Sequence, residues 1–225
     1  MLTLHHLEYS QSFRILWLLE ELGVEYELKK YDRDPKTRLA PDAYKSISPL
    51  GTAPVITDGD LVLAETSAIV DYILDQYPGS ALRPDAGTPN RSRHLFWFHA
   101  SQGSLMPLML MEAILNIALT RVPGIVRLVL KPVVQKIREG FTKPRTEAVL
   151  RLAEDHLSTA DFFGGEQLGA ADIVMSYPLE GARVSGYLGE ATPRCNAWLE
   201  RIHARSAFQK AKAKDGRDSM VLPLR

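Results

Sequence analysis

Residues 49–73, PLGTAPVITDGDLVLAETSAIVDYI, contain the local signals that decide the fold of the first part of the chain. Two short apolar runs, PVIT and LVLA, flank the dipeptide Asp58-Gly59, which is a strong signal for a tight turn. The two runs therefore predict a β-hairpin. Apolar residues at helical spacing follow over 65–77, and Pro78-Gly79 predicts where that helix ends.

The sequence before this stretch alternates between strand and helix patterns. The first residues, MLTLHHL, alternate with a period of two, and so does VEYELKKY over 24–31. Between them, residues 13–22 carry apolar side chains at helical spacing, and Gly23 is a good residue to end a helix. The predicted order is β-α-β followed by β-β-α, which gives an α+β domain over residues 1–80.

The rest of the chain predicts helices alone. Residues 81–89, ALRPDAGTP, are rich in Pro, Gly and Ala and predict a linker. Helical periodicity then recurs in five segments, 90–118, 123–139, 142–160, 169–185 and 194–211. Pro107 and Pro132 should kink or divide the longer helices. We therefore expect an all-helical domain over 90–225.

Composition limits the classes of function. The 27 basic and 27 acidic residues leave no net charge, which argues against a globally basic nucleic-acid-binding protein. The single cysteine cannot form an internal disulfide and fits a reducing compartment. The chain start lacks the pattern of a signal peptide, and Pro107, Glu112 and Asn116 interrupt the apolar stretch 105–120. We expect that stretch to be a core helix of a soluble, cytoplasmic protein, with no nucleic-acid or membrane partner.

Charge is nevertheless uneven along the neutral chain. Residues 1–80 hold six more acidic than basic residues, whereas residues 121–151 hold six more basic than acidic ones. Solvated helix faces explain such an excess most simply. The alternatives are charge complementarity between domains or subunits, and, less favoured because no aromatic residue interleaves the bases, a nucleic-acid patch.

The segment Tyr9-Ser10-Gln11-Ser12-Phe13-Arg14 joins the first predicted strand to the first predicted helix. A serine there commonly caps the helix. A helix N-terminus also binds anions, because its free N–H groups and its dipole point at the loop. No Asp/His pair is spaced to make Ser10 a nucleophile, and no GxSxG motif is present. As a functional role for Ser10 we favour a hydroxyl donor beside an anion.

Two further motifs follow in the quoted stretch. Proline at a strand start marks an edge or a bend, and a cis bond before Pro54 would expose the backbone of Ala53 to an extended, peptide-like ligand. Glu65-Thr66 opens the next helix, where a cap and a first-turn carboxylate are common. In a functional role, the Thr66 hydroxyl and N–H would hold a carboxylate and Glu65 an ammonium group, as an α-amino acid head group requires.

Together, Ser10-x-x-x-Arg14, PLGTAPVI at 49–56 and LAETSAIVDYI at 63–73 resemble the cytosolic glutathione S-transferases of the serine type, most of all their fungal and bacterial branch. LGAADIVMSYPL at 168–179 and PRCNAWLERI at 193–202 are similar to helices of the family's second half. The resemblance extends over nearly the whole chain. It implies a thioredoxin-like first domain, an all-α second domain and a homodimer.

The resemblance also implies an activity and a set of site residues. The activity is detoxifying transfer of glutathione, the co-substrate, to apolar electrophiles, with reduction of organic hydroperoxides as a side activity. Ser10 corresponds to the residue that hydrogen-bonds the glutathione sulfur. The glutathione-binding residues are then Thr52, Ala53, the cis-proline Pro54, Glu65 and Thr66. Thr52 stands where the family often has Lys or Gln, so Arg38 or Lys45 is left to meet the glycine carboxylate, and the sequence does not choose between them.

Thiol chemistry is consistent with this assignment. A free thiol has a pKa near 8.5, and the thiolate is the nucleophile. A hydrogen bond to a charged acceptor contributes about 1.5–3 kcal/mol and a helix N-terminus about 0.3–1 kcal/mol. The two are enough to ionise the bound thiol without a general base. Tyr9 is the rival donor, but strand alternation is expected to turn it away from Ser10.

The second substrate is expected in an apolar site. The run Leu105–Met111 supplies flexible, polarisable side chains, although such a stripe is more often part of a core. Met106 and Leu110 share a helix face and, with Tyr9, are the predicted residues of this site. We expect no metal, since no HExxH motif exists, and no disulfide chemistry at Cys195. The alternative to an enzyme is a non-catalytic carrier of apolar ligands, or a partner-binding regulator, on the same scaffold.

Overall fold

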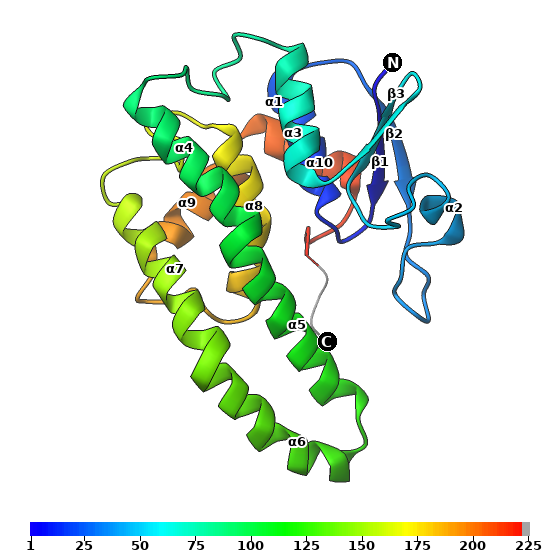
Figure 1. Cartoon of the computed structure of the whole chain (residues 1–225), viewed down its shortest axis with the longest axis vertical. Helices are drawn as coiled ribbons and strands as arrows, with labels where there is room; N and C mark the ends of the chain where they lie inside the picture. The colour runs from blue at the N-terminus through cyan, green and yellow to red at the C-terminus, as the bar shows by residue number, and fades with distance from the viewer. Residues whose placement is uncertain (222–225) are drawn as a thin grey trace.

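The computed structural model describes residues 1–221; residues 222–225, the last four of the predicted helical domain, lie outside the described residues. The chain begins with a four-stranded mixed sheet and its helices (Figure 1). The elements are β1 (Thr3–Leu7), α1 (Ser12–Leu22), β2 (Glu27–Tyr31), α2 (Asp42–Lys45), β3 (Val55–Asp58), β4 (Leu61–Ala64) and α3 (Thr66–Gln76). The strand order is β2-β1-β3-β4, with β1 and β2 parallel and the other pairs antiparallel.

The predicted β-α-β and β-β-α order is confirmed. The hairpin turns at Asp58-Gly59, as the sequence predicts. Helix α1 ends where Gly23 takes a left-handed conformation, with φ of 64°, which glycine adopts without steric cost. Helix α2 is an addition that the sequence analysis missed, since only four residues form it and no apolar periodicity marks so short a helix.

Helices make up the rest of the described chain. They are α4 (Pro89–Ala100), α5 (Met106–Arg121), α6 (Gly124–Ile137), α7 (Lys143–His156), α8 (Ala170–Val184), α9 (Pro193–His203) and α10 (Ser206–Asp215). One π-helical turn, Ser101–Leu105, joins α4 to α5, and another, Arg138–Thr142, joins α6 to α7. The predicted α+β class with an all-helical second half is therefore confirmed.

The predicted effect of proline is confirmed at Pro107, where a π-helical turn divides the segment 90–118 into α4 and α5. The two π-helical turns end two residues before Pro107 and Pro144, each of which lacks the N–H that an α-helical turn would need. Pro132 lies inside α6, which continues past it, so of the predicted kink or division the division is wrong. The predicted helical segment 194–211 is helical except at residues 204 and 205, which divide it into α9 and α10.

The core lies where α8 meets α1 and α4. Most of α8 is buried, and so is the apolar side of α1, which packs against α3, α8 and α10. Asp172 supports the start of α8, because its carboxylate accepts hydrogen bonds from the N–H of Gly169 at 2.9 Å, of Phe163 at 2.7 Å and of the Trp198 indole at 2.9 Å. This bonding ties the N–H of Gly169, the residue that precedes α8, to the first turn of the helix.

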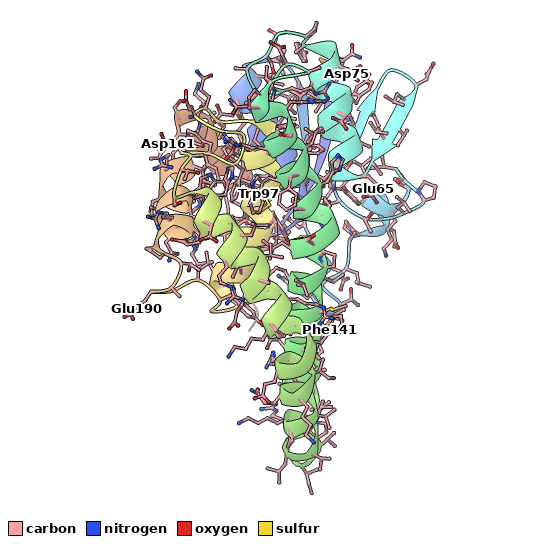
Figure 2. The ribbon with its side chains drawn as sticks, turned by 60° about the vertical axis from the view of Figure 1, so that its left-hand side comes forward. Glu65, Asp75, Trp97, Phe141, Asp161 and Glu190 are labelled. Atoms are coloured by element: carbon pink, nitrogen blue, oxygen red, sulfur yellow. The ribbon has the colours of Figure 1, made fainter. Side chains whose placement is uncertain are left out.

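The expectation of a core helix over 105–120 is wrong for most of α5. Of its residues, only Leu108, Met109 and Glu112 are buried, and Leu110 and Ile114 are more than half exposed. Helix α6 and the end of α5 form a long arm that projects from the rest of the molecule, whereas α7 returns to the body and packs on α9 (Figures 1 and 2). The continuous run Pro89–Arg121 is long and apolar enough to cross a membrane, by length and composition alone. Part of its exposed apolar surface faces a cavity, described below.

Candidate functional site

Three predicted site segments meet at one end of the sheet because of the strand register. Val55 at the start of β3 pairs with His5 of β1 on one side and with Ala64 at the end of β4 on the other. The loop after β1, the residues before β3 and the start of α3 therefore leave the sheet at the same end. Ser10, Ala53 and Glu65 lie in these three segments.

Ser10 lies in the turn before α1. Its hydroxyl donates to the Leu7 carbonyl at 2.7 Å and lies 2.7 Å from the hydroxyl of Ser12. The same oxygen accepts the backbone N–H of Ser12 at 3.2 Å. Gln11 is the N-cap residue of α1, and Ser10 precedes it with its oxygen at the positive end of the helix dipole.

The orientation of Tyr9 is set by a turn and not, as the sequence predicts, by strand alternation. Strand β1 ends at Leu7, so the strand alternation used to orient Tyr9 does not extend to it. Tyr9 instead has a left-handed backbone, with φ of 48°. Its ring faces the guanidinium groups of Arg38 and Arg217, at 5.8 and 5.7 Å from the ring centre. Strand alternation therefore does not distinguish Ser10 from Tyr9 as the donor. The turn at Tyr9 orients the two side chains.

The Ala53–Pro54 bond is cis. Thr52, just before this bond, is exposed, and the preceding residue, Gly51, has a left-handed φ of 59°. The side chain of Lys45 runs along this loop, since its Cγ would lie 3.3 Å from a Cβ placed on Gly51. Lys45 therefore lies beside the predicted glutathione-binding loop, whereas Arg38 lies against Tyr9.

The start of α3 combines a strained residue with a buried one. Glu65 has φ of 72°, a left-handed conformation that costs a non-glycine residue about 1–3 kcal/mol and is found mostly at functional sites. Its side chain is exposed at the base of α3 (Figure 2). Thr66 is buried, and its hydroxyl oxygen accepts a hydrogen bond from Nη2 of Arg14 at 3.0 Å.

Arg14 is fully buried, a feature that sequence reasoning did not anticipate. Its described hydrogen-bond acceptors are neutral: the Val174 carbonyl at 2.8 Å, the Gln11 amide oxygen and the hydroxyls of Ser101 and Thr66. Burial lowers the pKa of its guanidinium to about 9. An arginine that holds no carboxylate supplies net positive charge close to the start of α3.

A cavity of about 790 Å³ lies between the loop at 37–39 and helices α5 and α8. Met106 and Leu110 line it, as the sequence predicts, together with Met109 and Tyr177. Tyr9 is not in the lining, but the Tyr177 hydroxyl donates to the Tyr9 carbonyl at 3.5 Å. The cavity is mainly apolar, and the contact between Tyr177 and Tyr9 links its lining to the turn that carries Ser10.

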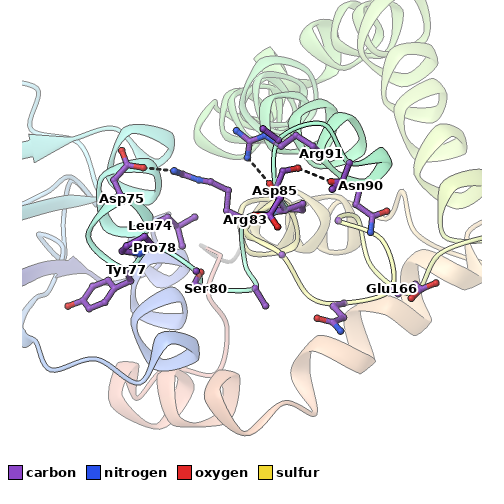
Figure 3. A pocket seen from close by; sticks show the side chains of 18 residues that line it. Leu74, Asp75, Tyr77, Pro78, Ser80, Arg83, Asp85, Asn90, Arg91 and Glu166 are labelled. Atoms are coloured by element: carbon purple, nitrogen blue, oxygen red, sulfur yellow. Dashed lines mark hydrogen bonds and ion pairs between the residues drawn. The ribbon is translucent and has the colours of Figure 1, made fainter.

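A second cavity, of about 780 Å³, lies near the segment 77–91 (Figure 3). Its lining includes Arg83, Arg91, Asp85 and Glu166, and none of the predicted site residues. Arg83 is already paired with Asp71 at 2.7 Å and with Asp75. The apolar cavity, and not this one, adjoins the predicted chemistry.

Comparison with known proteins identifies the family. Residues 1–75 match the family model "Glutathione S-transferase, N-terminal domain" and residues 138–201 match "Glutathione S-transferase, C-terminal domain". A curated relative, Glutathione S-transferase 3 of Schizosaccharomyces pombe, is 31% identical over 99% of this chain and 91% of its own length. The chain belongs to the glutathione S-transferase family.

Solved structures of the family have the same fold. A glutathione S-transferase from Actinobacillus pleuropneumoniae is 34% identical, with a TM-score of 0.77, over 96% of this chain and 93% of the other. A sphingomonad glutathione S-transferase, complexed with glutathione, has a TM-score of 0.72 at 21% identity over 95% and 98% of the two chains. The first likeness supports the family assignment, and the second concerns the fold.

This member of the family has a histidine and an aspartate close to Ser10 that sequence reasoning missed. Nδ1 of His6 lies 2.9 Å from the Ser12 hydroxyl, and its Nε2 lies 2.7 Å from Oδ1 of Asp215. His6 and Asp215 are 209 positions apart, so no sequence spacing could pair them. His6 lies in the run MLTLHHL that predicts the first strand, and the structure places it in β1.

The remaining candidates have structural surroundings. Cys195 is buried in α9, and its backbone N–H donates to the Glu154 carboxylate at 3.0 Å. His94 and His99 lie on α4, one buried and the other exposed. Within residues 1–221 no three His, Cys, Asp or Glu side chains gather in a way that would hold a metal ion.

Proposed function

We propose that this protein is a glutathione transferase of the serine type in which the Ser10 hydroxyl donates a hydrogen bond to the glutathione sulfur. The observation that carries the proposal is the meeting of Ser10, Ala53 and Thr66 at one end of the sheet, next to an apolar cavity. A charge-assisted hydrogen bond and the helix N-terminus favour the thiolate by about 2–4 kcal/mol together. That amount lowers a thiol pKa of about 8.5 by roughly one to three units, which ionises the bound thiol at neutral pH.

The glutathione backbone would lie along the cis loop and the start of α3. Ala53 and Pro54, with Thr52 beside them, would bind the cysteinyl unit through the main chain. Glu65 would meet the γ-glutamyl ammonium and Thr66 its carboxylate. We assign the glycine carboxylate to Lys45, because its side chain runs along Gly51 and Arg38 instead faces Tyr9.

The electrophile would occupy the apolar cavity. Met106 and Leu110 reach it from α5, and flexible methionine side chains adapt to ligands of different shape. Tyr9 would border it through its contact with Tyr177. An apolar lining of this kind favours apolar electrophiles as a class, and attack by the thiolate would proceed without a metal.

The wider assignments rest on the family. We infer a domain division of 1–80, a linker at 81–89 and a helical domain from 90, a homodimer, and a detoxifying role in the cytoplasm. The fungal or bacterial branch is supported by the Schizosaccharomyces pombe and Actinobacillus pleuropneumoniae relatives. The opposite charge excesses of residues 1–80 and 121–151 suit contact between two copies. Sedimentation at micromolar concentration tests the dimer, and a monomer would contradict it.

Two finer activities are proposed with separate tests. Organic hydroperoxides are polar at one end and apolar at the other, so they would enter the same cavity and be reduced by the same thiolate. Oxidation of glutathione by cumene hydroperoxide in the presence of the enzyme measures this side activity. The alternative function, a non-catalytic carrier or regulator, predicts apolar ligand binding with millimolar or absent glutathione binding.

The central test is calorimetric titration with glutathione, followed by the ultraviolet absorbance of the bound thiolate between pH 6.5 and 7.5. We expect binding with a thiolate signal, and a Ser10→Ala variant that still binds glutathione but loses about 10- to 100-fold in turnover. Unchanged turnover in Ser10→Ala would remove Ser10 from the mechanism and bring Tyr9 forward. Absence of binding would favour the carrier or regulator.

A further inference from the structure

A continuous chain of buried hydrogen bonds runs inward from Ser10. The Ser10 and Ser12 hydroxyls are 2.7 Å apart, the Ser12 hydroxyl is 2.9 Å from Nδ1 of His6, and Nε2 of His6 is 2.7 Å from Asp215. None of the four side chains is more than 5% exposed. The chain connects the loop after β1 to the end of α10, which packs on α1 (Figure 1).

Hydrogen-bond chemistry gives this chain a direction. The Asp215 carboxylate only accepts, so Nε2 of His6 donates to it and Nδ1 of a neutral imidazole is left as an acceptor. The Ser12 hydroxyl then donates to Nδ1, while its oxygen accepts from the Leu7 N–H at 3.2 Å. In that state the Ser12 oxygen can accept the proton of the Ser10 hydroxyl, which turns toward Ser12 from its other acceptor, the Leu7 carbonyl at 2.7 Å.

We propose that Ser12, His6 and Asp215 form a buried proton relay that receives the glutathione thiol proton through Ser10. The thiol proton moves to the Ser10 oxygen, the Ser10 proton to Ser12, and the Ser12 proton to Nδ1 of His6. One S–H bond breaks and one N–H bond forms, and each hydroxyl ends with one proton. The products are a thiolate and an imidazolium that stays paired with the Asp215 carboxylate.

The transfer also turns every hydroxyl toward the sulfur. Once His6 carries two protons, Nδ1 donates to Ser12, Ser12 donates to Ser10, and the Ser10 proton is left for the thiolate. A chain of aligned donors polarises each bond in turn, so the hydrogen bond to sulfur is strengthened. The relay rests on the proposed function of Ser10, and it adds the proton acceptor that the reaction otherwise leaves to solvent. Since none of the three touches glutathione, they are positioning residues.

Charged groups on the neighbouring elements do not compete for these hydrogen bonds. Lys30 of β2 is paired with His6 in the sheet register, but its ammonium group donates to the backbone carbonyls of Lys214 and Asp215 at 2.9 and 3.0 Å. Arg217 is paired with Glu8 at 2.9 Å and with Asp32 at 2.6 Å. The Asp215 side chain is thus left to His6.

A purely structural role for the chain, as a link between β1 and α10, makes a different prediction. If the chain were only such a link, any substitution in it would lower the stability of the protein. It would also lower activity by the same factor at every pH. The relay instead predicts a loss that depends on pH, because alkaline solution ionises the thiol without help.

The first experiment titrates the thiolate absorbance of the enzyme–glutathione complex with pH. We expect Ser12→Ala, His6→Gln and Asp215→Asn to raise the apparent pKa of the bound thiol by about one to two units, with glutathione affinity at low pH unchanged. Their kcat should approach the unsubstituted value as pH rises. His5→Gln is the matched control, since His5 precedes His6 in β1 and its ring forms hydrogen bonds with Tyr31 and Thr57 instead. If the three variants titrate like the unsubstituted enzyme, the relay is wrong.

The second experiment needs no variant and so does not depend on folding of the altered chains. Glutathione binding is measured by calorimetry at pH 7 in buffers of different ionisation enthalpy, which counts the protons released. A relay that keeps the proton on His6 predicts release close to zero together with a thiolate signal. Release of about one proton per site means that solvent takes it, and overturns the relay. Failure of the proposed function is distinguishable, because Ser10→Ala would then leave the thiolate signal intact.

Discussion

Nη2 of Arg14 donates a hydrogen bond to the Thr66 hydroxyl oxygen across 3.0 Å, inside the protein. The hydroxyl has one proton, and since its oxygen accepts from Arg14, that proton is free to be donated outward. Arg14 is thereby a support for the residue proposed to bind the γ-glutamyl carboxylate. Its charge acts in the same direction, because burial without a carboxylate partner leaves the positive charge uncompensated.

Glutathione affinity should depend on Arg14 through Thr66. Arg14→Lys is expected to weaken binding about 5- to 10-fold, the effect of one lost hydrogen bond, and Thr66→Val by a similar factor or more. In the Thr66→Val background, Arg14→Lys should add less than about twofold, because the two residues act together. Calorimetric titration of the four proteins measures this cycle. Equal effects of Arg14→Lys in both backgrounds would show that the two residues act independently.

The apolar cavity should determine the electrophile without affecting glutathione. Leu110→Lys places a charge in the cavity lining and is expected to lower kcat/KM for an apolar electrophile about tenfold or more, because the charge must lose its water. Glutathione affinity should stay within about twofold. Met111→Lys is the matched control, since Met111 is the next residue of α5, exposed and outside the cavity lining. Steady-state kinetics measure kcat/KM in both variants. An equal loss of kcat/KM in the two would contradict the assignment of this cavity.

Cys195 should be inert in the folded protein. It is fully buried, and burial raises the pKa of its thiol well above the usual range. We expect no reaction with an aromatic disulfide reagent at pH 8 over the time in which guanidinium-unfolded protein reacts completely. Mass spectrometry counts the modified cysteine in each state. Rapid modification of the native protein would mean that α9 opens locally.

How far the sequence could predict the fold depends on the range of each signal. The Asp58-Gly59 turn and the stop at Gly23 act over a few residues, and both were predictable because local backbone preference determines them. The exposure of α5 could not be predicted from the sequence. Its apolar side chains satisfy the pattern of a core helix equally well when they line a cavity, and periodicity alone cannot distinguish the two.

The residues of the candidate site also fall into two groups, those placed by local sequence signals and those placed by packing between distant parts of the chain. Ser10, Ala53 and Thr66 belong to motifs that lie at turns and helix starts, so their positions follow from local rules. The link from Ser12 through His6 to Asp215 arises only after α10 packs on α1. Arg14 was known as a motif residue, but its burial among neutral acceptors depends on α8, which lies far along the chain.

Acid stability should depend on His94. This residue of α4 is 3% exposed and stacks on Phe98, and its Nδ1 has no hydrogen-bond partner within the described chain. Burial, with the charges of Arg91 and Arg83 nearby, lowers the pKa of His94 from 6.5 to about 4. The unfolded chain therefore binds the proton first as pH falls, so this contribution to stability is complete above pH 6.5 and is lost progressively toward pH 4. The shift corresponds to about 3 kcal/mol. Guanidinium unfolding at a series of pH values should give a free energy that falls over this window, and His94→Phe should flatten the fall by that amount. His99→Phe, an exposed position on the same helix, should leave the curve unchanged, and an equal slope in His94→Phe and the unsubstituted protein would assign the acid sensitivity to another group.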